Sequence, residues 1–178
     1  MRVLVVDDSV LFRRVLAEVL ASFPGVEVVG TVANGRLALK RLPELRPEVI
    51  TLDIEMPEMD GLAVLDALRE RGEKIEILMV SALTKQGGQM TMRALEKGAF
   101  DFITKPDTAN LEQSRLAVRR ELEPRIRALA RRLEVRRILR PRVEPPARIQ
   151  GSAASLGAAR APAPISAKQR KEAGVDSV

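Results

Sequence analysis

The side chains that could carry chemistry in this 178-residue chain lie far apart in the sequence: Asp7, Asp8, Asp53, Ser81 and Lys105. Carboxylates that share one pocket repel one another and raise each other's pKa values. A hard divalent cation such as Mg²⁺ relieves this repulsion, because it takes oxygen ligands. A carboxylate is also a nucleophile, and a lysine ammonium suits a phosphoryl oxygen. If the fold gathers these residues, they predict a phosphoryl-transfer site that uses Mg²⁺.

The composition excludes several other kinds of site. The chain has no His and no Cys, which rules out a Ser–His–Asp triad, a His-ligated metal, thiolate chemistry and disulfides within it. No apolar run reaches the ~18 residues that a membrane span needs. Asp7 also interrupts the N-terminal apolar segment before a signal peptide could form. We therefore expect a cytoplasmic protein with no membrane partner.

Short apolar runs alternate with segments of helical periodicity along the first two thirds of the chain. The runs predict buried strands at Val3–Val6, Val26–Val32, Val49–Leu52, Ile77–Val80 and Phe100–Ile103. Five such alternations predict an α/β fold, a parallel sheet with helices on both faces. In such sheets ligands bind beyond the carboxyl ends of the strands. The five candidate residues all fall at those ends, so we expect them to lie together.

Four motifs in this order and spacing, VLVVDDS, TLDIEMPEMDGL, MVSA and DFITKP, resemble the receiver domain of two-component response regulators over residues 1–122. The resemblance implies a flavodoxin-like, doubly wound, five-stranded parallel sheet of order 2-1-3-4-5. It also implies phosphorylation by a histidine kinase, with Mg²⁺ as cofactor.

The resemblance further implies a role for each site residue. Asp53 matches the phosphoacceptor, and Lys105 and Ser81 match the conserved lysine and the switch hydroxyl. Phe102 matches the switch aromatic, and phosphorylation would draw Ser81 towards the phosphoryl group and let Phe102 move. The Mg²⁺ ligands would be Asp8 directly, Asp7 through water, Asp53, and the main-chain carbonyl of Glu55. The side chains of Glu55 and Leu83 would lean over the phosphoryl group and affect its hydrolysis.

Longer strings around these motifs, including SALTKQGGQMTMRALEKGAFDFITKP, resemble the receiver of the chemotaxis protein-glutamate methylesterase (CheB type). In that family an esterase domain with a Ser–His–Asp triad follows the receiver. This sequence has no His, and after Arg140 only a Pro- and Ala-rich stretch remains. We interpret Gly151–Ser155 as linker and not as a nucleophile elbow. The expected function is therefore a chemotaxis-type phosphoacceptor switch, either stand-alone or part of a truncated methylesterase regulator, with an esterase domain or another protein as its output partner. We expect no independent enzyme activity beyond phosphorylation and dephosphorylation at Asp53.

The C-terminal part is basic. Residues 1–106 hold 14 Lys and Arg against 16 Asp and Glu, whereas residues 107–178 hold 16 against 8. We expect a receiver at 1–122, a basic amphipathic helical linker at 123–140 with Pro124 in the first turn of a new helix, and a disordered tail at 141–178. A solvated extension is favoured for the linker over a docking surface for an acidic partner. A transcription regulator that binds DNA through this part is an alternative, disfavoured because no aromatic side chain there could stack on bases.

Overall fold

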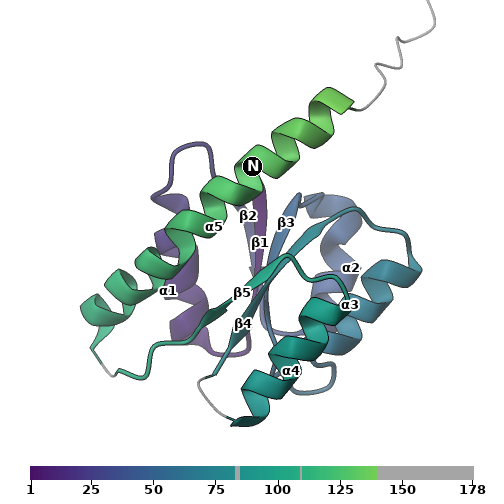
Figure 1. The fold of residues 1–178 in the computed structure, drawn as a ribbon. Helices are drawn as coiled ribbons and strands as arrows, with labels where there is room; N and C mark the ends of the chain where they lie inside the picture. Colours follow the sequence, from purple (N-terminus) through teal and green to yellow (C-terminus); the bar gives the residue numbers. More distant parts are fainter. Residues whose placement is uncertain (83–84, 109, 140–178) are drawn as a thin grey trace, which may run out of the picture. The chain divides into compact units, whose positions relative to one another are not determined.

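The computed structural model describes residues 1–82, 85–108 and 110–139, and these belong to one compact unit. Within them five strands alternate with five helices (Figure 1): β1 (Arg2–Val6), α1 (Val10–Ala21), β2 (Glu27–Val32), α2 (Gly35–Leu45), β3 (Val49–Asp53), α3 (Gly61–Glu70), β4 (Glu76–Ser81), α4 (Lys85–Glu96), β5 (Asp101–Thr104) and α5 (Leu111–Leu139). All strands are parallel, in the order β2-β1-β3-β4-β5. The predicted fold class and strand order are confirmed.

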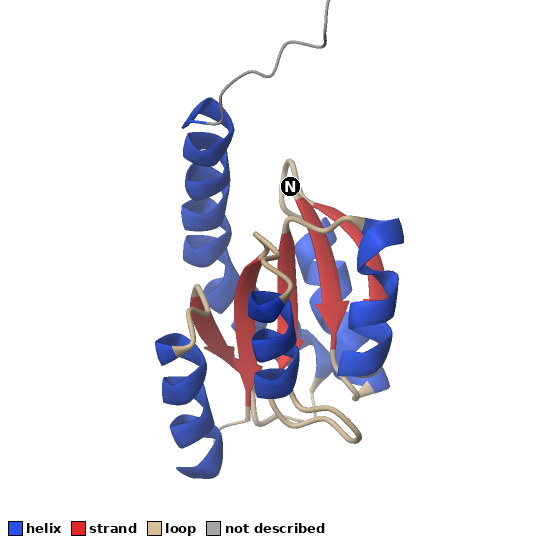
Figure 2. Ribbon diagram, turned by 90° about the vertical axis from the view of Figure 1, so that its right-hand side faces the viewer, coloured by secondary structure: helices blue, strands red, loops and turns tan. Residues whose placement is uncertain are grey.

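The strands form where apolar residues run without interruption, because both faces of the sheet are covered. Every residue of β3 and β4 is buried. Alternate side chains of a strand point to opposite faces, so Leu4 packs with one core cluster and Val5 with the other. Figure 2 shows the sheet between two layers of helices.

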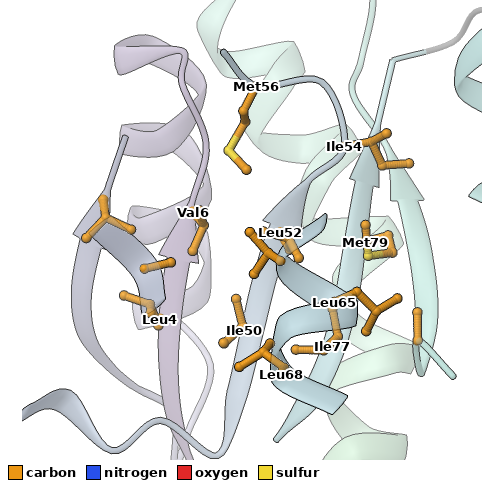
Figure 3. Packing of buried hydrophobic residues seen from close by; sticks show 14 of the residues in the cluster. Leu4, Val6, Ile50, Leu52, Ile54, Met56, Leu65, Leu68, Ile77 and Met79 are labelled. Carbon is orange, nitrogen blue, oxygen red and sulfur yellow. The ribbon is translucent and has the colours of Figure 1, made fainter. Parts of the chain in front are cut away.

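Two helices cover one face of the sheet and three cover the other. Side chains of α1 and α5 pack together on the face that carries Val3 and Val5. Side chains of α2, α3 and α4 cover the face that carries Leu4 and Val6. Figure 3 shows this second core, in which Leu65 and Leu68 of α3 lie over the strand residues. The two cores hold the strands in register, so that their carboxyl ends meet at one edge.

Helix starts are set by side chains that accept a hydrogen bond from the first turn. Ser9, Asn34 and Asp60 are the N-caps of α1, α2 and α3, and each accepts from the backbone N–H three residues on. Such caps stabilise a helix by about 1 kcal/mol each. Because α1 and α3 follow β1 and β3 after short loops, their caps also fix the backbone beside Asp7, Asp8 and Asp53.

Helix α5 is longer than the sequence predicts. It is continuous over 29 residues with Pro124 inside it, so the prediction of a new helix beginning at Pro124 is wrong. The prediction of a solvated extension is also wrong, because Ile126, Leu129 and Leu133 are buried in the same core cluster as Val118 and Leu122. That burial offsets the cost of a proline inside a helix.

The residues expected to form a disordered tail, 141–178, lie outside the described part of the chain. None of the helices in the described ranges is long and apolar enough to span a bilayer.

Candidate functional site

The carboxyl edge of the sheet gathers the predicted residues. Asp7 and Asp8 follow β1, Asp53 is the last residue of β3, and Ser81 is the last residue of β4. One carboxylate oxygen from each of Asp7, Asp8 and Asp53 lies within 4.8 Å of the others. Asp7 and Asp53 are buried, whereas Asp8 is exposed. The expected cluster of three carboxylates is therefore present at this edge, with one of them open to solvent.

Lys105, which follows β5, joins two of these carboxylates. Its Nζ lies 2.7 Å from Asp53 Oδ2 and 2.9 Å from Asp7 Oδ2. Its backbone N–H donates to the carbonyl of Ser81 at 2.8 Å, which fixes the loop after β5 to the end of β4. The ammonium also lies 5.2 Å from the centre of the Phe12 ring. One cation is thus held between two buried carboxylates.

The site changes the ionisation of its own residues. Burial raises the pKa of Asp53 to about 6, and the charges of Asp7 and Asp8 add to this, although Lys105 opposes it. Burial likewise raises the pKa of Asp7 against the effect of Lys105. Burial alone would lower the pKa of Lys105, but its hydrogen bond to Asp53 and the charge of Asp7 outweigh burial and raise it. Lys105 is therefore positively charged near neutral pH. Its single charge cannot neutralise all three carboxylates when they are ionised.

The donor set fits a hard divalent cation. Asp7 Oδ2 is buried, and the Lys105 ammonium lies 2.9 Å from it. Asp7 Oδ1 accepts from the Ser9 N–H at 2.8 Å, which fixes the carboxylate. A buried oxygen with an unused lone pair, beside two further carboxylates, matches the oxygen ligands that Mg²⁺ prefers. Asp7, Asp8 and Asp53 are the residues that would hold the ion.

The backbone after Asp53 is packed too closely for a side chain at Gly61. A Cβ at Gly61 would lie 2.3 Å from the carbonyl oxygen of Asp53. Gly61 N–H donates to the carbonyl of Ile54 at 2.9 Å, and Ile54 N–H donates to the carbonyl of Val80 at 3.0 Å. This loop therefore returns directly onto β3 and holds Asp53 in place. Glu55, expected to offer its carbonyl to the metal, lies in the same loop with an exposed side chain.

The two expected switch residues lie on adjacent strands. Ser81 is buried, and its hydroxyl donates to the carbonyl of Ala82 at 3.2 Å. Phe102 lies opposite Met79 in the β4–β5 pair and packs, partly buried, against the core on the α3 and α4 side. Leu83, expected to lean over the phosphoryl group, lies outside the described residues.

Two contacts of the site escaped sequence reasoning. Phe12 lies near the Lys105 ammonium, and Arg13 donates through Nη1 to the carbonyl of Asp7 at 2.6 Å. Both residues are on the first turn of α1, and a helix that begins directly after Asp8 could have pointed to them. Both contacts lie on the β1 side of the site.

The sequence of residues 3–115 matches the response regulator receiver domain family. The chain belongs to this family. The receiver is 47% identical over 132 residues to a protein-glutamate methylesterase/protein-glutamine glutaminase of Nocardioides sp., covering 74% of this chain and 36% of that protein. It is 50% identical over 117 residues to a protein of the same name from Archaeoglobus fulgidus, covering 66% of this chain and 33% of that one.

A solved structure has a similar fold. The response regulator domain of Thermotoga maritima CheB superposes on this receiver with a TM-score of 0.63 at 41% identity, covering 72% of this chain and 95% of that one. The resemblance to receivers of the CheB type is thereby confirmed. The chain spans roughly a third of the length of the curated relatives above. The family match ends at residue 115, whereas α5 continues to Leu139.

Proposed function

We propose that this receiver accepts a phosphoryl group on Asp53 from a chemotaxis-type histidine kinase and acts as a phosphorylation-dependent switch. The observation that carries the proposal is the position of Lys105 Nζ between Asp53 and Asp7, 2.7 and 2.9 Å from their Oδ2 atoms. A cation held there is placed to attract a phosphoryl oxygen when Asp53 is modified. The similarity to CheB-type receivers supports the chemotaxis assignment.

In the proposed reaction an Oδ atom of Asp53 attacks the phosphorus of a phosphohistidine. A P–O bond forms, the P–N bond breaks, and the imidazole leaves with the bonding electrons and takes up a proton. Lys105 exchanges its contact with Asp53 for one with a phosphoryl oxygen, and the Ser81 hydroxyl donates to another. Asp7, Asp8 and Asp53 would hold Mg²⁺, which would supply further positive charge beside the phosphoryl group.

The raised pKa of Asp53 has a bearing on this role. A carboxylate must be ionised to attack, and burial disfavours the ionised form. Lys105 counters that effect, since its ammonium donates a hydrogen bond to Asp53 Oδ2. We infer that the unmodified site keeps a reactive carboxylate paired with a cation, and that it can release that cation to the phosphoryl group.

The competing DNA-binding function is less well supported by the described residues. The arginines of the C-terminal half of α5 look like a basic surface in the sequence, but several of them form ion pairs within the receiver. Arg125 pairs with Asp101, Arg127 with Glu123, and Arg137 with Glu48. Paired arginines are already partly neutralised, which weakens the electrostatic attraction that non-specific DNA binding requires.

Phosphate uptake by single variants tests the proposal. The full chain is incubated with acetyl phosphate and Mg²⁺, and its intact mass is measured. The parent should gain the mass of one phosphoryl group, and Asp53→Asn should gain none. Asp66→Asn is the matched control, because Asp66 pairs with Lys97 on the surface of α3. Undiminished labelling of Asp53→Asn would reject Asp53 as the acceptor.

A further inference from the structure

The second half of α5, residues 123–139, binds the amino-terminal ends of β4 and β5, opposite the candidate site. Arg132 Nε lies 2.9 Å from Oε1 of Glu76, the first residue of β4, and Arg136 pairs with the same oxygen. Arg125 Nε lies 3.0 Å from Oδ2 of Asp101, the first residue of β5. We call residues 123–139 the α5 extension. In Figure 1 the α5 extension is the green end of the helix.

These contacts are firmer than those of a solvated helix. The Glu76 side chain is only 6% exposed, so its two arginines neutralise a carboxylate that water barely reaches. The Arg132 side chain is 58% exposed and that of Arg136 is 31% exposed, so this network is buried at its carboxylate and open to solvent at its guanidinium groups. The Asp101 contact is an ion pair without a hydrogen bond, since Arg125 Nε finds no acceptor of suitable geometry among the described residues. Leu129 and Leu133, buried beneath, hold the helix in place.

The same two strands carry the expected switch residues. β4 runs from Glu76 to Ser81, and β5 is only four residues long and leads directly into Lys105. Asp101 contacts both a switch residue and the α5 extension. Its Oδ1 accepts a hydrogen bond from the Phe102 N–H at 2.8 Å, and its Oδ2 pairs with Arg125. The Asp101 carboxylate therefore links the Phe102 backbone to the α5 extension.

We infer that the α5 extension is the element through which this receiver delivers its phosphorylation signal. Rearrangement at Ser81, Phe102 and Lys105 is transmitted along β4 and β5 to Glu76 and Asp101, and from these carboxylates to Arg125 and Arg132. This inference rests on the proposed function, and it adds a route that ends beyond the part of the chain that matches the receiver family. The arginines act as positioning residues and not as catalytic ones.

Amide hydrogen exchange on the full chain tests the inference. Exchange of peptides from residues 123–139 is compared with and without acetyl phosphate and Mg²⁺, and the intact mass is recorded on the same samples. Phosphorylation should change exchange rates there by about fivefold or more, the lower end of typical coupling between sites.

A pair of variants shows whether the arginines carry the signal. Arg125→Gln combined with Arg132→Gln should reduce the exchange change, with Arg136 still paired with Glu76, while Asp53 still takes up phosphate. Arg127→Gln combined with Arg131→Gln removes the same number of charges from the exposed side of the helix. This control variant should keep the exchange change of the parent. The corresponding Lys variants at 125 and 132 should restore part of the change, because they restore the charge.

The outcomes separate this inference from the proposed function. If the parent gains no phosphoryl mass, the proposed function itself fails. If the parent is phosphorylated and exchange in residues 123–139 is unchanged, the inference is overturned. The comparison of the phosphorylated with the unphosphorylated parent needs no substitution, so it tests the inference even if a variant does not fold. An exchange change of undiminished size after loss of Arg125 and Arg132 overturns the route through these arginines.

Discussion

The ammonium of Lys105 lies 2.7 Å from Asp53 Oδ2, and both side chains come from loops or strand ends 52 residues apart in the sequence. A second carboxylate, Asp7, lies 2.9 Å from the same ammonium. Because Asp7 and Asp53 are almost completely buried, water can do little to replace this cation. Lys105 is therefore a structural counter-charge in the unmodified receiver as well as a candidate catalytic group.

Replacing Lys105 by Met should lower the free energy of unfolding by about 3 kcal/mol near neutral pH, because it leaves buried carboxylates without their partner. Urea unfolding at pH 7.5 measures the loss. Lys97→Met is the control: Lys97 Nζ is 2.6 Å from Asp66 Oδ1, but both side chains are more than a third exposed. Such a surface pair is worth less than about 1 kcal/mol. Equal losses in the free energy of unfolding for the two variants would show that burial does not strengthen the ion pairs of Lys105.

Asp53→Asn should change the pH dependence of stability. The pKa of Asp53 is raised to about 6 by burial, so between pH 4 and 6 the native state holds a proton that the unfolded state has lost. The parent therefore loses stability as the pH rises through this window. Asn cannot ionise, so the stability of the variant relative to the parent should rise by about 2–3 kcal/mol from pH 4 to pH 7.

Urea unfolding at several pH values in the presence of a chelator measures this difference. The chelator is needed because a bound cation would itself favour the ionised carboxylate. A difference between parent and Asp53→Asn that stays constant from pH 4 to pH 7 would show that the Asp53 carboxyl is not desolvated in solution.

Mg²⁺ should raise the melting temperature of the parent, because an ion that binds only the native state stabilises that state. At a free Mg²⁺ concentration one hundred times Kd, the free energy of unfolding rises by about 2.7 kcal/mol. Asp8→Asn should remove most of this effect. Since Asp8 is exposed, the variant should melt near the parent temperature without metal, which separates ligand loss from misfolding. Glu58→Gln, in the β3–α3 loop with an exposed side chain, is the control. Full Mg²⁺ stabilisation of Asp8→Asn would remove Asp8 from the ligand set.

The site could be predicted because its geometry follows from topology. Once β1, β3, β4 and β5 are parallel neighbours, residues at their carboxyl ends must share one edge. Asp53 and Lys105 could therefore be placed together from the sequence, although the structure extends β3 and β4 to include Asp53 and Ser81. The helix that begins after Asp8 brings Phe12 near this edge, but its contact with Lys105 also depends on the angle at which α1 leaves the sheet.

The α5 extension was mispredicted for two physical reasons. A proline inside a helix removes a backbone hydrogen bond, so local reasoning starts a new helix at Pro124, whereas burial of the apolar face overrides that local cost. The arginines look solvated because their partners are distant in sequence: Glu76 is 56 residues from Arg132, and Glu48 is 89 residues from Arg137. Long-range ion pairs leave no periodic signal, so composition alone suggests a basic surface.

A pair of alanine substitutions on α5 tests whether its second half belongs to the folded receiver. Leu129 is fully buried, so Leu129→Ala should lower the free energy of unfolding by about 2–5 kcal/mol through lost burial and the cavity left behind. Ile138 lies nine residues further along the same helix with 72% of its surface exposed, and Ile138→Ala should change stability by less than about 0.5 kcal/mol. Both substitutions replace a large aliphatic side chain by alanine, so helix propensity changes little in either case.

Urea unfolding followed by far-ultraviolet circular dichroism measures the two losses. A single transition with a large loss for Leu129→Ala alone is expected if the α5 extension unfolds together with the sheet, whereas equally small losses would mean that this half of the helix is solvated and that its arginines cannot hold β4 and β5.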